Sequence, residues 1–138
     1  MNVNTDKTIT LDAGNFKLSM GAKVFFNDPP VNNTLLFVSI YSDGFSGNMT
    51  MDVGSSDVES FTKQLTAMND VVKGSAKIKE TYGDGYIEME MDRTGHVIVR
   101  GFVYDSFQKL SFDNRFELSY LDSFVKALAN TEEWQVTE

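Results

Sequence analysis

The sequence predicts an α+β domain in which one antiparallel β-sheet carries two helices packed on one of its faces. Three observations indicate this. Segments of alternating apolar and polar residues are joined by glycine-containing turns, two other stretches have apolar residues at helical spacing, and these two helical stretches resemble each other. A chain of 138 residues, 41% of them apolar, is large enough to bury a core, so we expect a single domain spanning residues 1–138.

The first hairpin is predicted in the segment TLLFVSIYSDGFSGNMTMDV, residues 34–53. Asp43-Gly44 is the residue pair that a two-residue type I′ turn prefers. A turn at this position makes one face of the hairpin apolar, because it pairs Ile40 with Gly47, Val38 with Met49 and Leu36 with Met51.

A helix is predicted over residues 56–69. Ser56 and Glu59 have the spacing of a capping box, in which each side chain accepts a hydrogen bond from a backbone N–H at the start of the helix. Val58, Phe61, Leu65 and Met68 then form one apolar stripe, which we expect to face the sheet.

A second helix is predicted near residues 119–129, where LDSFVKAL (121–128) echoes VESFTKQL (58–65) at an offset of 63 residues. The same offset superposes Tyr104 on Tyr41. We interpret this as an internal repeat of two ββα units, about 35–69 and 98–130, with Phe124 and Leu128 buried. Chance similarity between two amphipathic helices is the alternative.

Two turns organise the strands between the helices. A two-residue turn at Asp84-Gly85 would place Lys79 opposite Glu90 and Lys77 opposite Asp92. A three-residue turn at 93–95, with Gly95 in the left-handed region, would place Asp92 opposite His96 and Glu88 opposite Arg100. Both registers bury the same apolar face: Ile87, Met89, Met91, Val97, Val99 and Val103.

Glu88, Glu90 and Asp92 alternate along one strand, and His96, the only histidine, follows them. The simplest interpretation is a ladder of ion pairs with cations on neighbouring strands, with His96 as a turn residue. The alternative is a metal or acid–base site. However, residues two apart on a strand stand about 7 Å apart, at about 3.3 Å rise per residue, which is too far to share one ion without a further ligand. We therefore expect no metal and no catalytic residues here.

The composition excludes several functional classes. With no cysteine and one histidine, the chain lacks the residues of most nucleophilic and zinc-dependent enzymes, and none of its glycine-rich stretches has the context of a phosphate-binding loop. We expect a non-enzymatic protein without a cofactor. We also expect a cytoplasmic location, because no apolar stretch has the length of a signal peptide core or a membrane span.

The charge and the aromatic residues point to a protein partner. The net charge of −8 disfavours direct binding to nucleic acid or to a membrane surface and favours a basic protein. Aromatic residues among charges are typical of protein–protein contacts, and the outward face of the predicted sheet carries Phe37, Tyr41, Tyr86, Ile98, Phe102 and Tyr104. The alternative is that the N-terminal strands, within residues 7–26, cover this face. Our candidate partner-binding residues are Tyr41, Glu88, Glu90, Phe102 and Tyr104.

Residues 34–130 carry a family resemblance. The apolar stripe of the first helix, the stretches KGSAKIKETY and GHVIVRGFVYDSFQKLSF, and the closing YLDSFVKAL resemble WapI-like bacterial immunity proteins and related uncharacterised small bacterial families. The resemblance implies a cytoplasmic protein that neutralises a toxin domain made by the same cell, and it implies no catalytic residues.

A second functional class stays open. An α+β domain of this size can also hold a pocket between its helices and its sheet, and such a pocket could bind a small molecule or support catalysis. In that case we would expect Glu88, Glu90 or His96 at its mouth. The sequence does not predict the oligomeric state.

Overall fold

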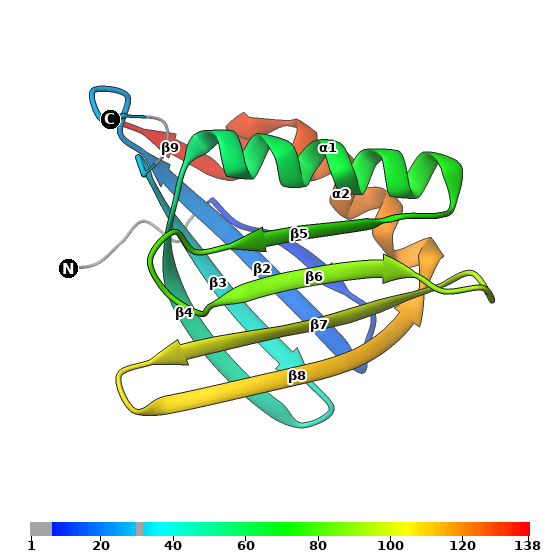
Figure 1. Ribbon diagram of the computed structural model, residues 1–138. Coiled ribbons are helices and arrows are strands. Elements are labelled where there is room, and N and C mark those ends of the chain that lie inside the picture. The colour runs from blue at the N-terminus through cyan, green and yellow to red at the C-terminus, as the bar shows by residue number, and fades with distance from the viewer. Residues whose placement is uncertain (1–6, 30–31) are drawn as a thin grey trace.

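The computed structural model describes residues 7–29 and 32–138 (Figure 1). Its elements follow one another along the chain in this order: β1 (Ile9–Asp12), β2 (Phe16–Val24), β3 (Thr34–Ser42), β4 (Phe45–Val53), α1 (Ser55–Val71), β5 (Ser75–Lys79), β6 (Tyr86–Met91), β7 (His96–Asp105), β8 (Gln108–Glu117), the 3₁₀ turn η1 (Leu118–Tyr120), α2 (Leu121–Ala129), the 3₁₀ turn η2 (Thr131–Glu133) and β9 (Gln135–Thr137). No helix in the described part of the chain combines the length and the apolar character needed to cross a membrane.

The strands form two sheets rather than the single sheet that we expected. The first has the order β1-β2-β3-β4, with β9 parallel to β2 beyond the part of β2 that pairs with β1. The second has the order β5-β6-β7-β8, and all its pairs are antiparallel. The predicted α+β class, with antiparallel strands and two helices, is confirmed.

The two sheets pack against each other, and most of the core lies between them. Phe16 on β2 contacts two rings on β8, with centroids 5.8 Å from Phe112 and 5.9 Å from Phe116. The two helices, of 17 and 9 residues, are too few to cover the apolar faces of all these strands. Burying one sheet on the other solves this problem, because it removes both apolar faces from water at once.

Both helices lie on the same side of the molecule, where they close one end of the space between the sheets (Figure 1). Helix α1 packs beside β5, α2 packs near β1, and the helices contact each other. Phe61, Leu65, Phe124 and Leu128 are buried, as predicted. Trp134, which follows η2, is fully buried, and its Nε1 donates to the Leu128 carbonyl at 3.1 Å.

Two of the three predicted turns are confirmed. Asp43 and Gly44 have φ of 47° and 92°, and β3 and β4 pair in the predicted register. Gly95 has φ of 83°, and β6 and β7 also pair as predicted, with Glu88 opposite Arg100.

The predicted register of β5 and β6 was wrong. Lys77 lies opposite Glu88 and Lys79 opposite Tyr86, because the connecting loop is longer than a two-residue turn. Glu80 holds this loop: its backbone N–H donates to the Gly85 carbonyl at 2.9 Å, and its carboxylate accepts from the Gly85 N–H at 3.0 Å. The observed register differs from the predicted one by an even number of residues, so the same side chains point inward.

The predicted helix cap was also wrong. The N-cap residue of α1 is Gly54, whose N–H donates to the Asp57 carboxylate at 2.9 Å, and the capping pair is not Ser56 with Glu59. Gly54 has no side chain to accept a hydrogen bond. The buried Asn33 takes over part of this role, since its Oδ1 accepts from the Ser55 N–H at 2.8 Å.

The hairpins β3–β4 and β7–β8 have the same geometry at the 63-residue offset. Ser42 pairs with Phe45 and Asp105 with Gln108, and the turn residues Asp43 and Ser106 both have positive φ, 47° and 55°. The duplication itself stays a prediction, because two hairpins can reach the same register independently.

Candidate functional site

The outward face of the second sheet, here called the outer face, contains four of the five candidate residues. Glu88 and Glu90 lie on β6, and Phe102 and Tyr104 lie on β7. They share one face because side chains alternate along a strand, while Ile87, Met89, Val97 and Val99 point into the core.

The carboxylates of the outer face form ion pairs across the strands. Arg100 Nη1 lies 3.3 Å from Glu88 Oε1 and 3.8 Å from Glu90 Oε1, and Arg115 Nη1 lies 3.7 Å from Asp92 Oδ2. This confirms the charge ladder, although Arg100 serves both glutamates and Lys79 does not pair with Glu90. Lys77 Nζ instead lies 4.9 Å from the centroid of the Tyr86 ring.

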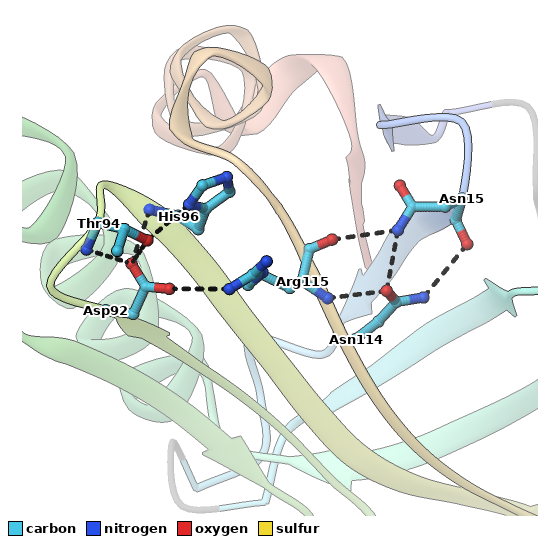
Figure 2. Close-up of polar contacts among 6 residues, drawn as sticks. All are labelled: Asn15, Asp92, Thr94, His96, Asn114 and Arg115. Atoms are coloured by element: carbon cyan, nitrogen blue, oxygen red, sulfur yellow. Dashed lines mark hydrogen bonds and ion pairs between the residues drawn. The ribbon is translucent and has the colours of Figure 1, made fainter.

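Asp92 organises the turn that carries His96 (Figure 2). Its Oδ1 accepts hydrogen bonds from the Thr94 N–H at 2.8 Å, the Thr94 hydroxyl at 2.8 Å and the His96 N–H at 2.9 Å. The hydrogen bond from the His96 N–H is the main cause that lowers the pKa of Asp92. His96 Nδ1 lies 2.8 Å from the Thr94 hydroxyl. These contacts build a turn, and among residues 7–29 and 32–138 no three His, Cys, Asp or Glu side chains gather as metal ligands.

At the other end of the outer face, Phe102 and Tyr104 stack with centroids 5.5 Å apart. The Tyr104 hydroxyl donates a hydrogen bond to the Glu80 carboxylate. This bond raises the pKa of Tyr104 to about 12, with further contributions from desolvation and from the charges of Glu80, Asp84 and Asp52. Tyr104 is therefore hydrogen-bonded to one carboxylate, lies in the field of two more and stacks on the Phe102 ring.

Two further aromatic side chains lie in the adjoining loops. Tyr82, between β5 and β6, is 84% exposed, and Phe107, in the turn between β7 and β8, is 94% exposed. Both loops lie at the same end of the second sheet, on the left of Figure 1. We call this region the aromatic end: Tyr82, Phe102, Tyr104 and Phe107 with Asp52, Glu80 and Asp84.

The sequence interpretation missed Tyr82 and Phe107. It placed Tyr82 in a strand, because the turn was assigned to Asp84-Gly85, and it did not consider Phe107. The signal that could have found them is an aromatic residue directly beside turn residues, as in Tyr82-Gly83 and Ser106-Phe107.

Tyr41 lies apart from the other candidates, on β3 in the first sheet, where Lys17 Nζ lies 5.5 Å from the centroid of its ring. Phe37, also on β3, lines a groove of about 500 Å³ that continues to Tyr104 and Asp105. The N-terminal strands do not cover the aromatic side chains, because β1 and β2 extend the first sheet beside β3. That alternative was wrong.

A separate apolar groove of about 670 Å³ runs along α1. Its lining includes Val24, Val58, Thr62, Thr66, Ala67 and Leu128. The Thr62 and Thr66 hydroxyls donate to the carbonyls of Val58 and Thr62, at 2.9 and 2.8 Å. A pocket beside the helices is therefore present, but the residues expected at its mouth, Glu88, Glu90 and His96, do not line it.

No protein-family model matches the chain, and a comparison with curated proteins gives no match. The function is therefore inferred from the site.

Proposed function

We propose that this protein is a non-enzymatic, protein-binding domain that acts as an immunity protein and neutralises a cognate bacterial toxin domain. The observation that supports this best is the aromatic end, where the exposed Tyr82 and Phe107 accompany the half-buried Phe102 and Tyr104, and where carboxylates act on Tyr104. Aromatic side chains anchor protein interfaces with little loss of conformational freedom, and charges around them steer the partner. The resemblance to WapI-like immunity proteins supports the same function.

Phe102 and Tyr104 have the geometry of anchor residues. The two rings stack on each other, and the Glu80 carboxylate holds the Tyr104 hydroxyl, so little freedom is lost when a partner binds. Glu88 and Glu90 lie further along the outer face, where they would form the polar rim of the contact. Tyr41 would join only if the partner also reached the first sheet.

The charge supports a basic partner. The outer face itself mixes cations with carboxylates, and at the aromatic end the carboxylates of Asp52, Glu80 and Asp84 outnumber the ammonium groups of Lys79 and Lys109. With the net charge of −8, this disfavours direct binding to nucleic acid and would accelerate association with a basic toxin. A toxin inside the producing cell must be neutralised in the cytoplasm, which is the location we propose.

The proposal requires a toxin domain encoded beside this gene, and co-expression with that domain tests it. We expect wild-type protein to protect cells, and Phe102→Ala or Tyr104→Ala to weaken binding by about 2 kcal/mol, as expected for anchor residues. Tyr120→Ala removes an exposed aromatic side chain that follows the other end of the second sheet and serves as the control. Cell death in the presence of a soluble, folded wild-type protein would contradict the immunity function.

The groove along α1 favours a second candidate, the binding of a small apolar molecule. Its volume of about 670 Å³ lies in the range of known ligand pockets, about 300–1,000 Å³. A fragment screen by NMR would show shifts at Val58, Thr62 and Leu128, and Thr66→Trp, which would fill the groove, should abolish them. Shifts only at the aromatic end would contradict this candidate.

A further inference from the structure

Strand β8 forms an edge of the second sheet. Among the described strands it pairs only with β7. In an antiparallel pair, every second residue directs its backbone N–H and C=O away from the partner strand. Half of the residues of β8 therefore present these groups to the open edge.

The hydrogen bonds of Arg115 show which residues of β8 direct their backbone groups to the open edge (Figure 2). Its carbonyl accepts a hydrogen bond from Asn15 Nδ2 at 3.1 Å, and its N–H donates to Asn114 Oδ1 at 2.8 Å, so both groups face away from β7. By alternation, the backbone groups of Lys109, Ser111 and Asp113 face the same edge. Asn15 and Asn114 close the edge at Arg115, which leaves an open window over residues 109–113.

The side chains of this window are complementary to themselves. A strand that pairs with its own copy around a two-fold axis at the centre of the window places Ser111 opposite Ser111, and Lys109 opposite the other copy's Asp113. Lys109 and Asp113 are exposed, and within residues 7–29 and 32–138 neither has an ion-pair partner. Two opposite charges face each other on both sides of the axis.

We propose that two copies of this protein pair through the β8 edge, antiparallel and centred on Ser111, so that the two second sheets become one continuous sheet. Ser111 exchanges two backbone hydrogen bonds with its copy, and each Lys109 exchanges two with the other copy's Asp113. The partner is a second copy of this chain because the window specifies its own register through Lys109 and Asp113.

The surroundings of the window have room for this strand. A groove of about 420 Å³ separates residues 109–113 from the turn between β3 and β4. Phe45, at the rim of this groove, is 69% exposed. The second copy covers this ring, which otherwise remains in water.

The corresponding edge of the first sheet does not fit a second copy. On β4 the residues at the 63-residue offset are Ser46, Asn48 and Thr50, which carry no charge. The next outward-facing carbonyl, that of Asp52, already accepts a hydrogen bond from the Thr81 N–H at 2.9 Å. Asp52, Glu80 and Asp105 line the groove beside this edge. Pairing β4 with its copy would bring these carboxylates together, and like charges repel.

Analytical ultracentrifugation of the full chain at increasing concentration tests the proposal. The window is short, so the dimer is weak, and the series should extend to about 1 mM, since contacts below about 1,000 Å² are typical of weak association. Ser111→Pro removes the central N–H without breaking a bond to β7, and we expect a monomer. Asn48→Pro makes the same change on the β4 edge and should leave the dimer intact.

A charge exchange provides the second test. Lys109→Asp puts two carboxylates on each side of the axis and should raise the dissociation constant about tenfold. Lys109→Asp combined with Asp113→Lys restores opposite charges and should restore the dimer, which decides the question even if the proline variant does not fold. A wild-type monomer at every concentration, equal effects of the two proline variants, or no rescue by the charge exchange would overturn the proposal. Toxin binding is measured separately, and its outcome does not affect this test.

Discussion

The Tyr104 hydroxyl donates a hydrogen bond to the carboxylate of Glu80, a residue 24 positions earlier in the chain. This contact ties the end of β7 to the loop between β5 and β6. The same carboxylate accepts a hydrogen bond from Gly85, so one buried side chain holds the loop and orients the ring that we propose as an anchor.

We predict that Tyr104→Phe destabilises the protein by about 1 kcal/mol at neutral pH, the usual contribution of a hydrogen bond. Folding raises the pKa of Tyr104 from 10.0 to about 12, mainly because its hydroxyl donates a hydrogen bond to the Glu80 carboxylate. The stabilisation of the folded state by this hydrogen bond is therefore complete below pH 10 and is lost as the pH rises toward 12. Tyrosinate absorbance measures this directly: the wild-type protein should contain one group that titrates near 12 and that is missing in Tyr104→Phe.

Gly83→Ala should loosen the same contact. A Cβ atom at Gly83 would collide with the Glu80 carboxylate and with the Tyr104 hydroxyl. Both groups lie at the ends of flexible side chains that can shift. We therefore expect Gly83→Ala to lower the free energy of unfolding by about 1–2 kcal/mol rather than to prevent folding. The Tyr104 pKa should move back toward 10. Thr81→Ala, an exposed position in the same loop that does not contribute to the Tyr104 pKa, is the control, and an unchanged Tyr104 titration in Gly83→Ala would contradict the role of this close approach.

Changing both Glu88 and Glu90 to Gln should alter the free energy of unfolding by about 1 kcal/mol or less, because exposed ion pairs contribute little. Urea denaturation measures the change. The same variant should mainly slow association with a basic partner, and its on-rate should depend less on salt than that of the wild type. Binding of a divalent ion that depends on both glutamates would refute their assignment to a charge ladder.

Phe124→Ala should cost about 3–5 kcal/mol, because this buried ring packs in the core beneath α2. Tyr120→Ala, four positions earlier and exposed, should change stability by about 0.5 kcal/mol or less. Thermal unfolding of the two variants side by side measures the difference. Equal effects would contradict the position of α2 in the structure.

Local signals predicted the parts of the fold that local chemistry determines. Asp43-Gly44 and Gly95 specify backbone conformations that few other residues adopt, so both hairpin registers could be read from the sequence. The register of β5 and β6 could not, because Glu80 sets it through contacts with Gly85 and Tyr104. Alternation shows which side chains point inward but not what they face, which is why two packed sheets were predicted as one.

The candidate site was predictable to the same extent. Alternation placed Glu88, Glu90, Phe102 and Tyr104 on one face, as the structure shows. It could not separate Tyr41, because the division into two sheets is a property of the whole fold. Tyr82 and Phe107 lie in loops, where no periodic pattern exists, and only the structure shows that these two loops lie at the same end of the sheet (Figure 1).

The buried Trp134 makes the protein its own fluorescent reporter. It is the only tryptophan in the chain, and it lies directly before β9, with its indole bonded to the end of α2. Its emission therefore reports the docking of this last segment on the core, where the Trp134 carbonyl accepts a hydrogen bond from the Ala22 N–H of β2 at 3.0 Å. If β9 detaches from β2 before the sheets separate, the emission shifts to longer wavelength before the circular dichroism signal of the strands is lost. If the two signals change together, the parallel strand and the antiparallel sheets belong to one cooperative unit.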